Sequence, residues 1–148
     1  MTKSRAYRME PAETIRGRDW IGSTHIPPAT VLMICPEQQF AEKLHAYTFP
    51  RLVTPNSRVR DLVDMLLLIE SKTLSMERTN EAIAGTFGRR GTHPIPSALQ
   101  PPRKEWEKPF SALAAECGIQ TDVDLTFKTI DAFYRSLRKS QNLRGRQL

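Results

Sequence analysis

Residues 36–71, PEQQFAEKLHAYTFPRLVTPNSRVRDLVDMLLLIES, decide the fold because they predict two helices joined by a proline-bounded loop. Pro36 suits the first position of the first helix, where no N–H is needed and φ is already helical. Phe40, Leu44 and Tyr47 then recur at spacings of four and three residues. Because this periodicity gathers them on one apolar stripe, the segment is expected to be an amphipathic helix.

The second helix is expected to begin after a break in this stretch. Pro50 and Pro55 bracket the break, since each lacks an N–H and disfavours helix in the residue before it. Ser57 is expected to be the N-cap, because its hydroxyl can accept from the N–H groups of the first turn. Residues 65–69 are all apolar, which predicts that this end of the helix is enclosed. The predicted buried face consists of Val59, Leu62, Val63 and Leu66.

Three charged residues lie beside these apolar faces. Asp61 and Asp64, three residues apart, share one side of the second helix, at the predicted mouth of a groove. Lys43 lies next to the apolar stripe of the first helix, and helices joined by a short loop usually pack antiparallel, so the three are expected to converge. An alternative stays open. The acids are then solvated residues near a helix N-terminus, or partners of Arg58 and Arg60.

The composition is that of an ordinary globular protein. The chain has 148 residues and a formal net charge of +6, which suits one domain and permits, without demonstrating, an anionic partner such as RNA. Cys35 and Cys117 stand far apart, so we expect neither a disulfide framework nor a cysteine zinc site, and a cytoplasmic location. His25, His45 and His93 add no metal-ligand spacing, and no apolar run reaches the length of a membrane span.

The two ends of the chain differ from its middle. Residues 1–19 are polar and lack apolar periodicity, which predicts a poorly ordered lead-in. Residues 30–34, TVLMI, form the one convincing strand. It needs a partner strand, from another chain for example, or it lies against the helices as an extended segment. Residues 140–148 form a basic tail, and its basic run begins at Arg135. Two interpretations of that run stay open: a surface that follows phosphates, or a solubilising and frayed end.

Three further helices are expected between the strand and the tail. The third begins after Ser75 and ends near Gly88 and Gly91, with Arg89 and Arg90 complementing its carbonyl end. A proline-rich, packed loop covers residues 93–103, and a fourth helix covers 109–117. The fifth starts at Thr121 in a capping box. The predicted fold is therefore mainly α, a helical domain over residues 20–139 with about five helices and at most one or two short strands.

Several strings of this sequence resemble one protein family. AEKLHAYT, then NSRVRDLVDMLLLIE, then AIAGTFGRRGTHPIPSAL resemble, in that order, the C-terminal half of the AbiEii/AbiGii abortive-infection toxins. The resemblance covers about residues 21–137. These toxins are nucleotidyltransferase-like proteins of bacterial toxin–antitoxin systems, so the resemblance implies a phage-defence role. It also implies that Lys43 contacts the triphosphate and that Asp61, with Asp64 as the second candidate, assists the acceptor hydroxyl or a metal.

The same resemblance implies an N-terminal half that this sequence does not show. That half carries Gly-Ser and, about ten residues later, an Asp-x-Asp metal pair. Gly22-Ser23 is followed ten residues on by no carboxylates, and Asp122-x-Asp124 stands at a predicted helix start, where it suits capping. A truncated or split family member is therefore expected, inactive by itself.

The family also implies particular cofactors and partners. They are Mg²⁺ and a nucleoside triphosphate, an RNA acceptor such as tRNA, an antitoxin encoded nearby, and a chain that supplies the missing half. The alternative is a non-catalytic remnant or scaffold that binds RNA or a partner chain.

Overall fold

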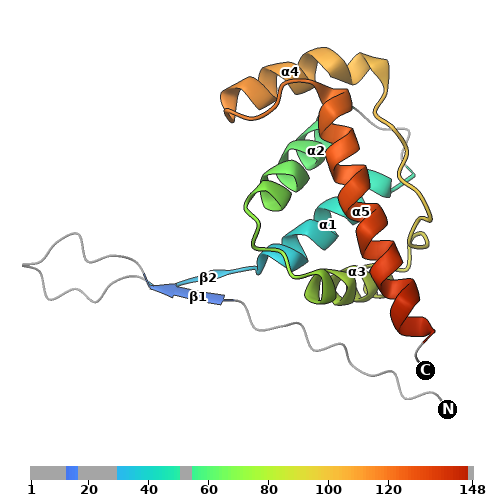
Figure 1. The fold of residues 1–148 in the computed structure, drawn as a ribbon. Helices are drawn as coiled ribbons and strands as arrows, with labels where there is room; N and C mark the ends of the chain where they lie inside the picture. Colours follow the sequence, from blue (N-terminus) through green and yellow to red (C-terminus); the bar gives the residue numbers. More distant parts are fainter. Residues whose placement is uncertain (1–12, 17–29, 51–54, 147–148) are drawn as a thin grey trace, which may run out of the picture. The chain divides into compact units, whose positions relative to one another are not determined.

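The protein is mainly helical, as the sequence predicts (Figure 1). The structure, a computed structural model, describes residues 13–16, 30–50 and 55–146. The chain divides into two compact units, residues 1–35 and 36–148. The helical unit therefore begins at Pro36, whereas the sequence placed its start at residue 20. The elements are β1 (Glu13–Arg16), β2 (Thr30–Met33), α1 (Pro36–Thr48), α2 (Pro55–Glu70), α3 (Met76–Arg90), the 3-10 turn η1 (Lys104–Trp106), α4 (Glu107–Glu116) and α5 (Val123–Gly145).

The first unit contains a two-stranded antiparallel ribbon. β2 is the strand predicted from TVLMI, and it pairs with β1 in a register that sets Glu13 opposite Met33 and Ile15 opposite Val31. Its partner thus comes from this chain, within the stretch predicted to be a lead-in without structure. The sequence did not predict β1, because its four residues include a single large apolar side chain and show no strand pattern.

The first two helices form where the prolines and the apolar stripe predict them. α1 begins at Pro36, and Phe40, Leu44 and Tyr47 are all buried. α2 begins at Pro55, two residues before the predicted cap, so Ser57 lies inside the helix and the prediction that it is the N-cap was wrong. The reason is that proline, with its fixed φ and no N–H, itself fits the first helical position.

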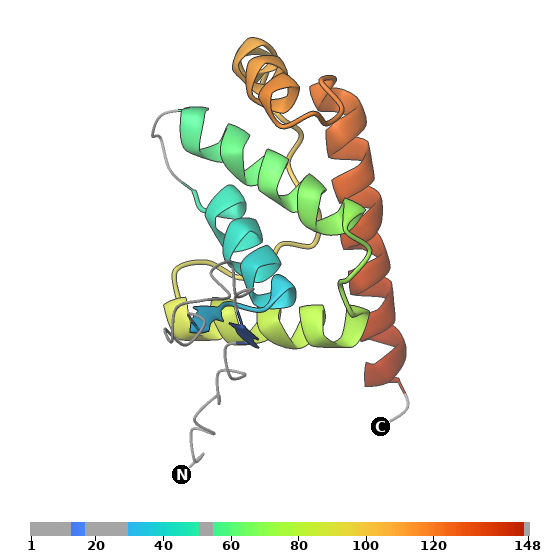
Figure 2. The same ribbon diagram turned by 90° about the vertical axis from the view of Figure 1, so that its left-hand side faces the viewer.

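The core of the helical unit forms around α2, which packs against α1, α4 and α5. Figure 2 shows α2 between α4 on one side and α1 on the other, with its C-terminal end against α5. Leu62, Met65 and Leu66 are almost completely buried, and Ile130 and Leu137 of α5 are equally buried. The predicted buried face of α2, Val59 to Leu66, is confirmed.

The third helix has the predicted ends. Ser75 is the N-cap of α3, accepting from the N–H of Arg78, and Gly91 follows the helix at φ 55°, a left-handed conformation that favours glycine. Gly88 lies within the helix rather than at its end. The buried carboxylate of Glu37 accepts from the Ser75 N–H at 3.1 Å, which joins the start of α1 to the start of α3.

The loop between α3 and α4 is packed, as its prolines predict. Leu99 is buried, and two tyrosine hydroxyls donate to loop carbonyls. Tyr47 of α1 donates to the carbonyl of Gln100 at 2.7 Å, and Tyr134 of α5 donates to that of Pro96. The loop is therefore fixed to two helices, beside α5 in Figure 1.

The last two helices are joined by a short turn. Gly118, at φ 66°, follows α4 in a left-handed conformation that favours glycine. Asp122, not Thr121, is the N-cap of α5, and its carboxylate accepts from the N–H groups of Asp124 and Leu125. The predicted cap at Thr121 was wrong because the carboxylate of Asp122 satisfies these donors with α5 starting at Val123. α5 continues to Gly145, so most of the predicted tail is helical.

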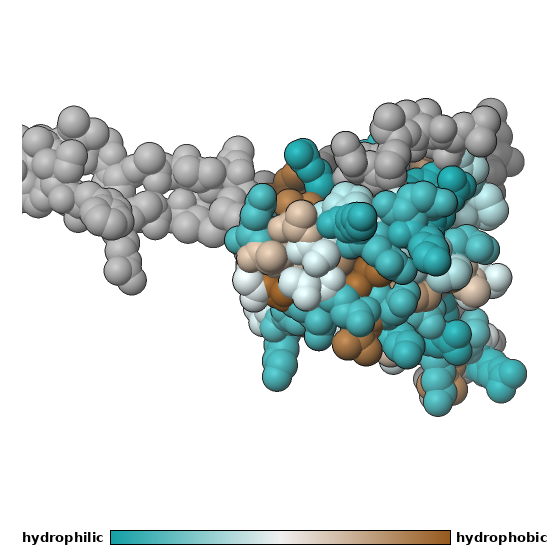
Figure 3. Space-filling model, turned by 90° about the horizontal axis from the view of Figure 1, so that it is seen from above, coloured by the Kyte–Doolittle hydropathy of each residue, from teal (hydrophilic) through white to brown (hydrophobic). Residues whose placement is uncertain are grey.

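The described surface is largely polar on the face shown in Figure 3. Hydrophilic residues cover most of the helical unit in that view, and apolar residues form several small patches. Within residues 13–16, 30–50 and 55–146, no helix has both the length and the hydropathy needed to cross a bilayer.

Candidate functional site

Lys43, Asp61 and Asp64 converge between α1 and α2, as the sequence predicts. The Lys43 ammonium lies 2.7 Å from Oδ2 of Asp64 and 3.7 Å from Oδ1 of Asp61. One lysine of α1 therefore bridges two carboxylates of α2. The alternative that the acids are merely solvated does not fit this geometry, at least for Asp61, which is buried.

The two carboxylates lie in different environments. The side chain of Asp61 is 10% exposed, whereas that of Asp64 is 41% exposed. Burial raises the pKa of Asp61 to about 6, although the nearby Lys43 charge opposes the rise. The pKa of Lys43 is raised, first by its hydrogen bond to Asp64. The cluster thus combines a fixed cation with one carboxylate that titrates close to neutral pH.

The charge of Arg58 also acts on Asp61. It lowers the pKa of Asp61, with a smaller effect than burial, Lys43 or Asp64. The Arg58 guanidinium donates as well to the carbonyl of Phe49, at the start of the loop that joins the two helices. Among the charges that lower the pKa of Asp61, that of Lys43 has the largest effect.

We predict that Asp61→Asn stabilises the fold at pH 8 by about 1–3 kcal/mol. The folded pKa of Asp61, about 6, exceeds its ordinary value of 3.8, so its contribution favours the folded state below pH 4 and is lost as the pH rises through 6. The difference in unfolding free energy between the variant and the wild type should therefore grow from pH 4 to pH 8 in urea titrations.

Asp124→Asn is the control for this pH dependence. Asp124 is an exposed carboxylate in the first turn of α5, where negative charge is favourable, so its replacement should not stabilise the protein. An Asp61→Asn variant that is less stable than the wild type at pH 8 would show that the ion pair with Lys43 outweighs the cost of burial.

The cluster does not fit a magnesium ion as it stands. Mg²⁺ requires near-octahedral oxygen ligands, and here the Lys43 ammonium occupies the space beside both carboxylates. Across the part of the chain that the structure describes, no group of three or more histidine, cysteine, aspartate or glutamate side chains could hold a metal. No metal-dependent step can therefore be assigned to these residues alone.

The Asp-x-Asp, Gly-Ser and histidine residues are the other candidate metal-site motifs in the sequence. Asp122 caps α5, which confirms the capping interpretation of Asp122-x-Asp124. Gly22 and Ser23 lie outside the described residues. His45 and His93 lie ring to ring at 4.6 Å and contact Phe87, and burial lowers the pKa of both. These two histidines belong to an aromatic cluster that joins the end of α1 to the end of α3.

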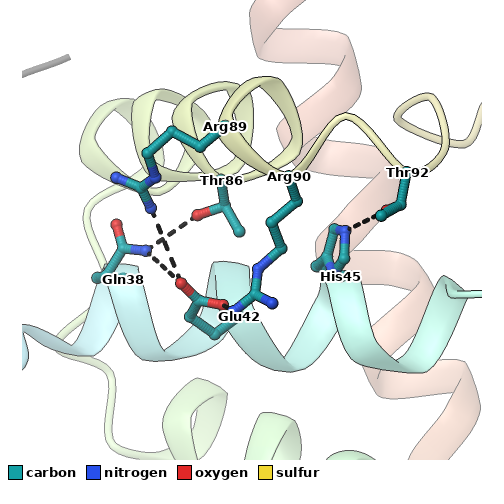
Figure 4. A network of polar contacts seen from close by, with 7 residues as sticks. All are labelled: Gln38, Glu42, His45, Thr86, Arg89, Arg90 and Thr92. Atoms are coloured by element: carbon teal, nitrogen blue, oxygen red, sulfur yellow. Dashed lines mark hydrogen bonds and ion pairs between the residues drawn. The ribbon is translucent and has the colours of Figure 1, made fainter. Parts of the chain in front are cut away.

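A second polar network, which the sequence did not predict, joins α1 to α3 (Figure 4). The carboxylate of Glu42 lies 2.5 Å from Arg90 and 3.8 Å from Arg89, and it accepts from Gln38 at 3.1 Å. Gln38 also donates to Thr86 at 2.9 Å. Arg89 and Arg90 therefore bind a neighbouring helix in addition to complementing the end of their own. Glu42 has a structural role, although it precedes Lys43 directly.

Two surface hollows are each lined in part by residues of the loop between α3 and α4. The first, here called the aromatic hollow, has a volume of about 450 Å³. The second, the basic hollow, has about 410 Å³. Sequence reasoning missed the aromatic hollow, because its walls come from four separate segments. The aromatic hollow includes Tyr47, Phe49, Arg58, Arg103 and Trp106. The basic hollow includes Ser97, Arg135, Arg138, Lys139, Asn142 and Arg146.

Comparison with known families decides the relationship that the quoted strings suggest. The family described as nucleotidyl transferase AbiEii toxin, type IV toxin–antitoxin system, matches residues 4–139. The chain belongs to the AbiEii family. The match to AbiEii begins at residue 4. The resemblance of the quoted strings begins only near residue 21. No curated protein and no solved structure matches the chain.

Membership in AbiEii fits the convergence of the three charged residues. The strings that carry the resemblance, AEKLHAYT and NSRVRDLVDMLLLIE, are those that place Lys43 on α1 and the two acids on α2. The family is one of nucleotidyl transferases and of toxins that have an antitoxin. The strings thus carry both the family relationship and the Lys43–Asp61–Asp64 geometry.

Proposed function

We propose that this chain supplies the helical half of a nucleotidyltransferase toxin site, in which Lys43, Asp61 and Asp64 contact the reactants. The observation that supports it most is the bridge from Lys43 to both acids, with distances of 2.7 and 3.7 Å. Phosphoryl transfer depends chiefly on positioning and on charge stabilisation, which a fixed ammonium and a nearby carboxylate can supply.

In this proposal Lys43 binds the triphosphate. Its side chain is 38% exposed, so an incoming phosphate can reach the ammonium without breaking the core. A lysine acts as a point charge toward phosphate oxygens. The more exposed acid, Asp64, holds the ammonium in place until the more highly charged triphosphate replaces it as the partner.

Asp61 then orients the acceptor hydroxyl. A base is most effective when its pKa lies near the working pH, and burial brings that of Asp61 to about 6. At pH 7 most Asp61 side chains are ionised yet more basic than an ordinary aspartate. The carboxylate can therefore accept the proton of a hydroxyl that attacks the α-phosphorus of the nucleoside triphosphate, while the bond from that phosphorus to the bridging oxygen breaks and pyrophosphate leaves.

The remaining parts of the proposed reaction come from outside the described helices. We propose that a segment with Gly-Ser and Asp-x-Asp motifs binds Mg²⁺ and the nucleoside triphosphate, and that this chain is a truncated or split member that lacks it. RNA such as tRNA is the proposed acceptor, a nearby gene encodes the antitoxin, and phage defence in the cytoplasm is the proposed setting.

A labelling experiment tests this proposal. Purified chain is incubated with labelled nucleoside triphosphates, magnesium and total RNA, with and without a polypeptide that carries the family's Gly-Ser and Asp-x-Asp motifs. We expect no labelled RNA from the chain alone and magnesium-dependent labelling from the mixture. Labelling by the chain alone, abolished by Lys43→Ala, would contradict the proposed inactivity and support a complete enzyme.

The second candidate function is a non-catalytic scaffold that binds RNA or a partner chain. It is favoured by the basic hollow, where Arg138, Lys139 and Arg146 have no carboxylate partner within the described residues. Under this alternative the mixture would bind RNA without labelling it. An open reading frame for the Gly-Ser and Asp-x-Asp segment just upstream would favour the enzymatic proposal.

A further inference from the structure

We propose that the two hollows together bind a single-stranded nucleic acid, with its terminal nucleotide in the aromatic hollow and the preceding phosphates along the basic hollow. This inference rests on the proposed function, because it treats the strand as the acceptor that presents its terminal hydroxyl to Asp61. It adds a binding site that lies outside the Lys43 cluster.

The aromatic hollow has the chemistry of a nucleotide site. Phe49 is half-buried and provides an aromatic wall, while Tyr47 and Trp106 border the hollow with only 3% and 6% of their surface exposed. Arg58 and Arg103 provide two cations, and no acid is among the residues that form the hollow. Aromatic side chains receive bases of any sequence, while guanidinium groups bind phosphate. The volume of about 450 Å³ lies within the range of small-molecule sites.

The walls of this hollow continue the helix faces that carry the charged cluster. Tyr47 follows Lys43 by four residues on α1, and Arg58 precedes Asp61 by three on α2, so each pair shares one side of its helix. The charge of Arg58 reaches both Asp61 and Tyr47, since it lowers the pKa of each. A nucleotide in the hollow therefore lies about one helical turn from the proposed base.

The basic hollow follows the C-terminal half of α5. Its cations span from Arg135 to Arg146, which is about 16 Å along a helix at 1.5 Å per residue. Arg135 is paired with Asp131 at 2.9 Å, whereas Arg138, Lys139 and Arg146 have no such partner in the described part of the chain. These cations are available to several successive phosphates.

The loop between α3 and α4 contributes to both hollows. Pro96 and Ala98 border the aromatic hollow, and Ser97 between them borders the basic hollow, so the loop itself separates the two. The loop is fixed there, because Tyr134 donates to the carbonyl of Pro96. In the proposed complex the strand passes over this loop from one hollow to the other.

The combination of the two hollows favours a polynucleotide over other ligands. A free nucleotide would fill the aromatic hollow and leave the cations of α5 without a role, and an acidic peptide would not need the aromatic walls. Single-stranded nucleic acid uses both features, since its bases bind aromatic surfaces and its phosphates bind a cationic groove.

Binding of fluorescein-labelled octanucleotides, measured by anisotropy over a range of salt concentrations, tests the basic hollow without requiring any transfer reaction. Arg138→Ala/Lys139→Ala should weaken binding at least tenfold at low salt. It should also reduce the slope of log affinity against log salt by about 1.4, because each phosphate contact on a single strand contributes about 0.7. Comparing RNA and DNA octanucleotides shows which of the two nucleic acids the protein binds more tightly.

Lys108→Ala/Lys128→Ala is the matched control, because both lysines are exposed and lie outside the two hollows. This double variant removes two positive charges, as Arg138→Ala/Lys139→Ala does. This control should bind like the wild type. An equal loss of affinity in both double variants would overturn the proposal, since it would show attraction to net charge alone. Unchanged binding by Arg138→Ala/Lys139→Ala would overturn it as well.

The aromatic hollow is tested by fluorescence of Trp106. Trp20→Phe leaves Trp106 as the single tryptophan of the chain. We expect the octanucleotide to quench this fluorescence, and Arg103→Ala to weaken the quenching at least fivefold. Absence of quenching would overturn the placement of the terminal nucleotide. A nucleoside triphosphate is tested in the same way. If it quenches Trp106 as strongly as the octanucleotide does, and Arg138→Ala/Lys139→Ala does not change that quenching, the aromatic hollow binds the donor nucleotide and the proposal is overturned.

Discussion

Leu66→Ala is expected to lower the free energy of unfolding by about 2–5 kcal/mol, which is a large share of the stability of a small domain. Leu66 is 2% exposed on α2, the helix that packs against α1, α4 and α5. The loss combines the hydrophobic transfer energy of the removed atoms with the cost of the cavity they leave. Urea unfolding followed by circular dichroism measures it directly.

Leu67→Ala is the matched control, one position along the same helix. Leu67 is 39% exposed, so the same substitution there removes little buried area and should cost less than about 1 kcal/mol. Both variants lose the same atoms and both gain alanine's helix propensity. Equal unfolding energies for the two variants would show that the face from Val59 to Leu66 is not the core of the helical unit.

The helices of this fold could be predicted because their signals are local. α1 and α3 begin and end at the residues that the prolines, Ser75 and Gly91 predict, since capping and proline chemistry depend only on near neighbours. Val123, Ile130 and Leu137 of α5 recur at helical spacing in the sequence, and all three are buried. Periodicity over about four turns gives a strong signal.

The features that could not be predicted depend on competition between neighbouring capping residues or on contacts with residues distant in the sequence. Ser57 and Thr121 are acceptable caps by themselves, but Pro55 and Asp122 provide the helix starts instead. β1 consists of four residues whose strand state follows from pairing with β2. Neither the helix starts nor the state of β1 can be read from the few residues of a local sequence pattern.

The candidate site was predictable in its members but not in its asymmetry. Resemblance and helix spacing named Lys43, Asp61 and Asp64. They could not show that Asp61 is enclosed and Asp64 half exposed, because burial depends on the helices that pack around each position. The aromatic hollow also remained hidden, since Tyr47 and Trp106 come together only through the fold.

Lys43→Met is expected to reduce nucleotide transfer by the reconstituted mixture roughly 100-fold or more, the size of effect seen when one charge-stabilising group is removed from an active site. Two losses combine in this variant. The triphosphate loses its ammonium partner, and the pKa of Asp61 rises above its present value of about 6 because the opposing charge of Lys43 is gone. A larger fraction of Asp61 is then protonated at pH 7 and unable to accept a proton. Initial rates of RNA labelling between pH 6 and pH 9 measure both losses.

Lys128→Met controls for the loss of a lysine, because Lys128 is exposed on α5 and lies outside the cluster. It should label RNA at the wild-type rate. The double variant Lys43→Met/Asp61→Asn then separates catalysis from folding. Replacing both members of a partly buried pair with neutral residues of similar shape is often neutral or stabilising, so the variant should remain folded while transfer is lost. A double variant that transfers nucleotides at the wild-type rate would show that Lys43 and Asp61 only join α1 to α2.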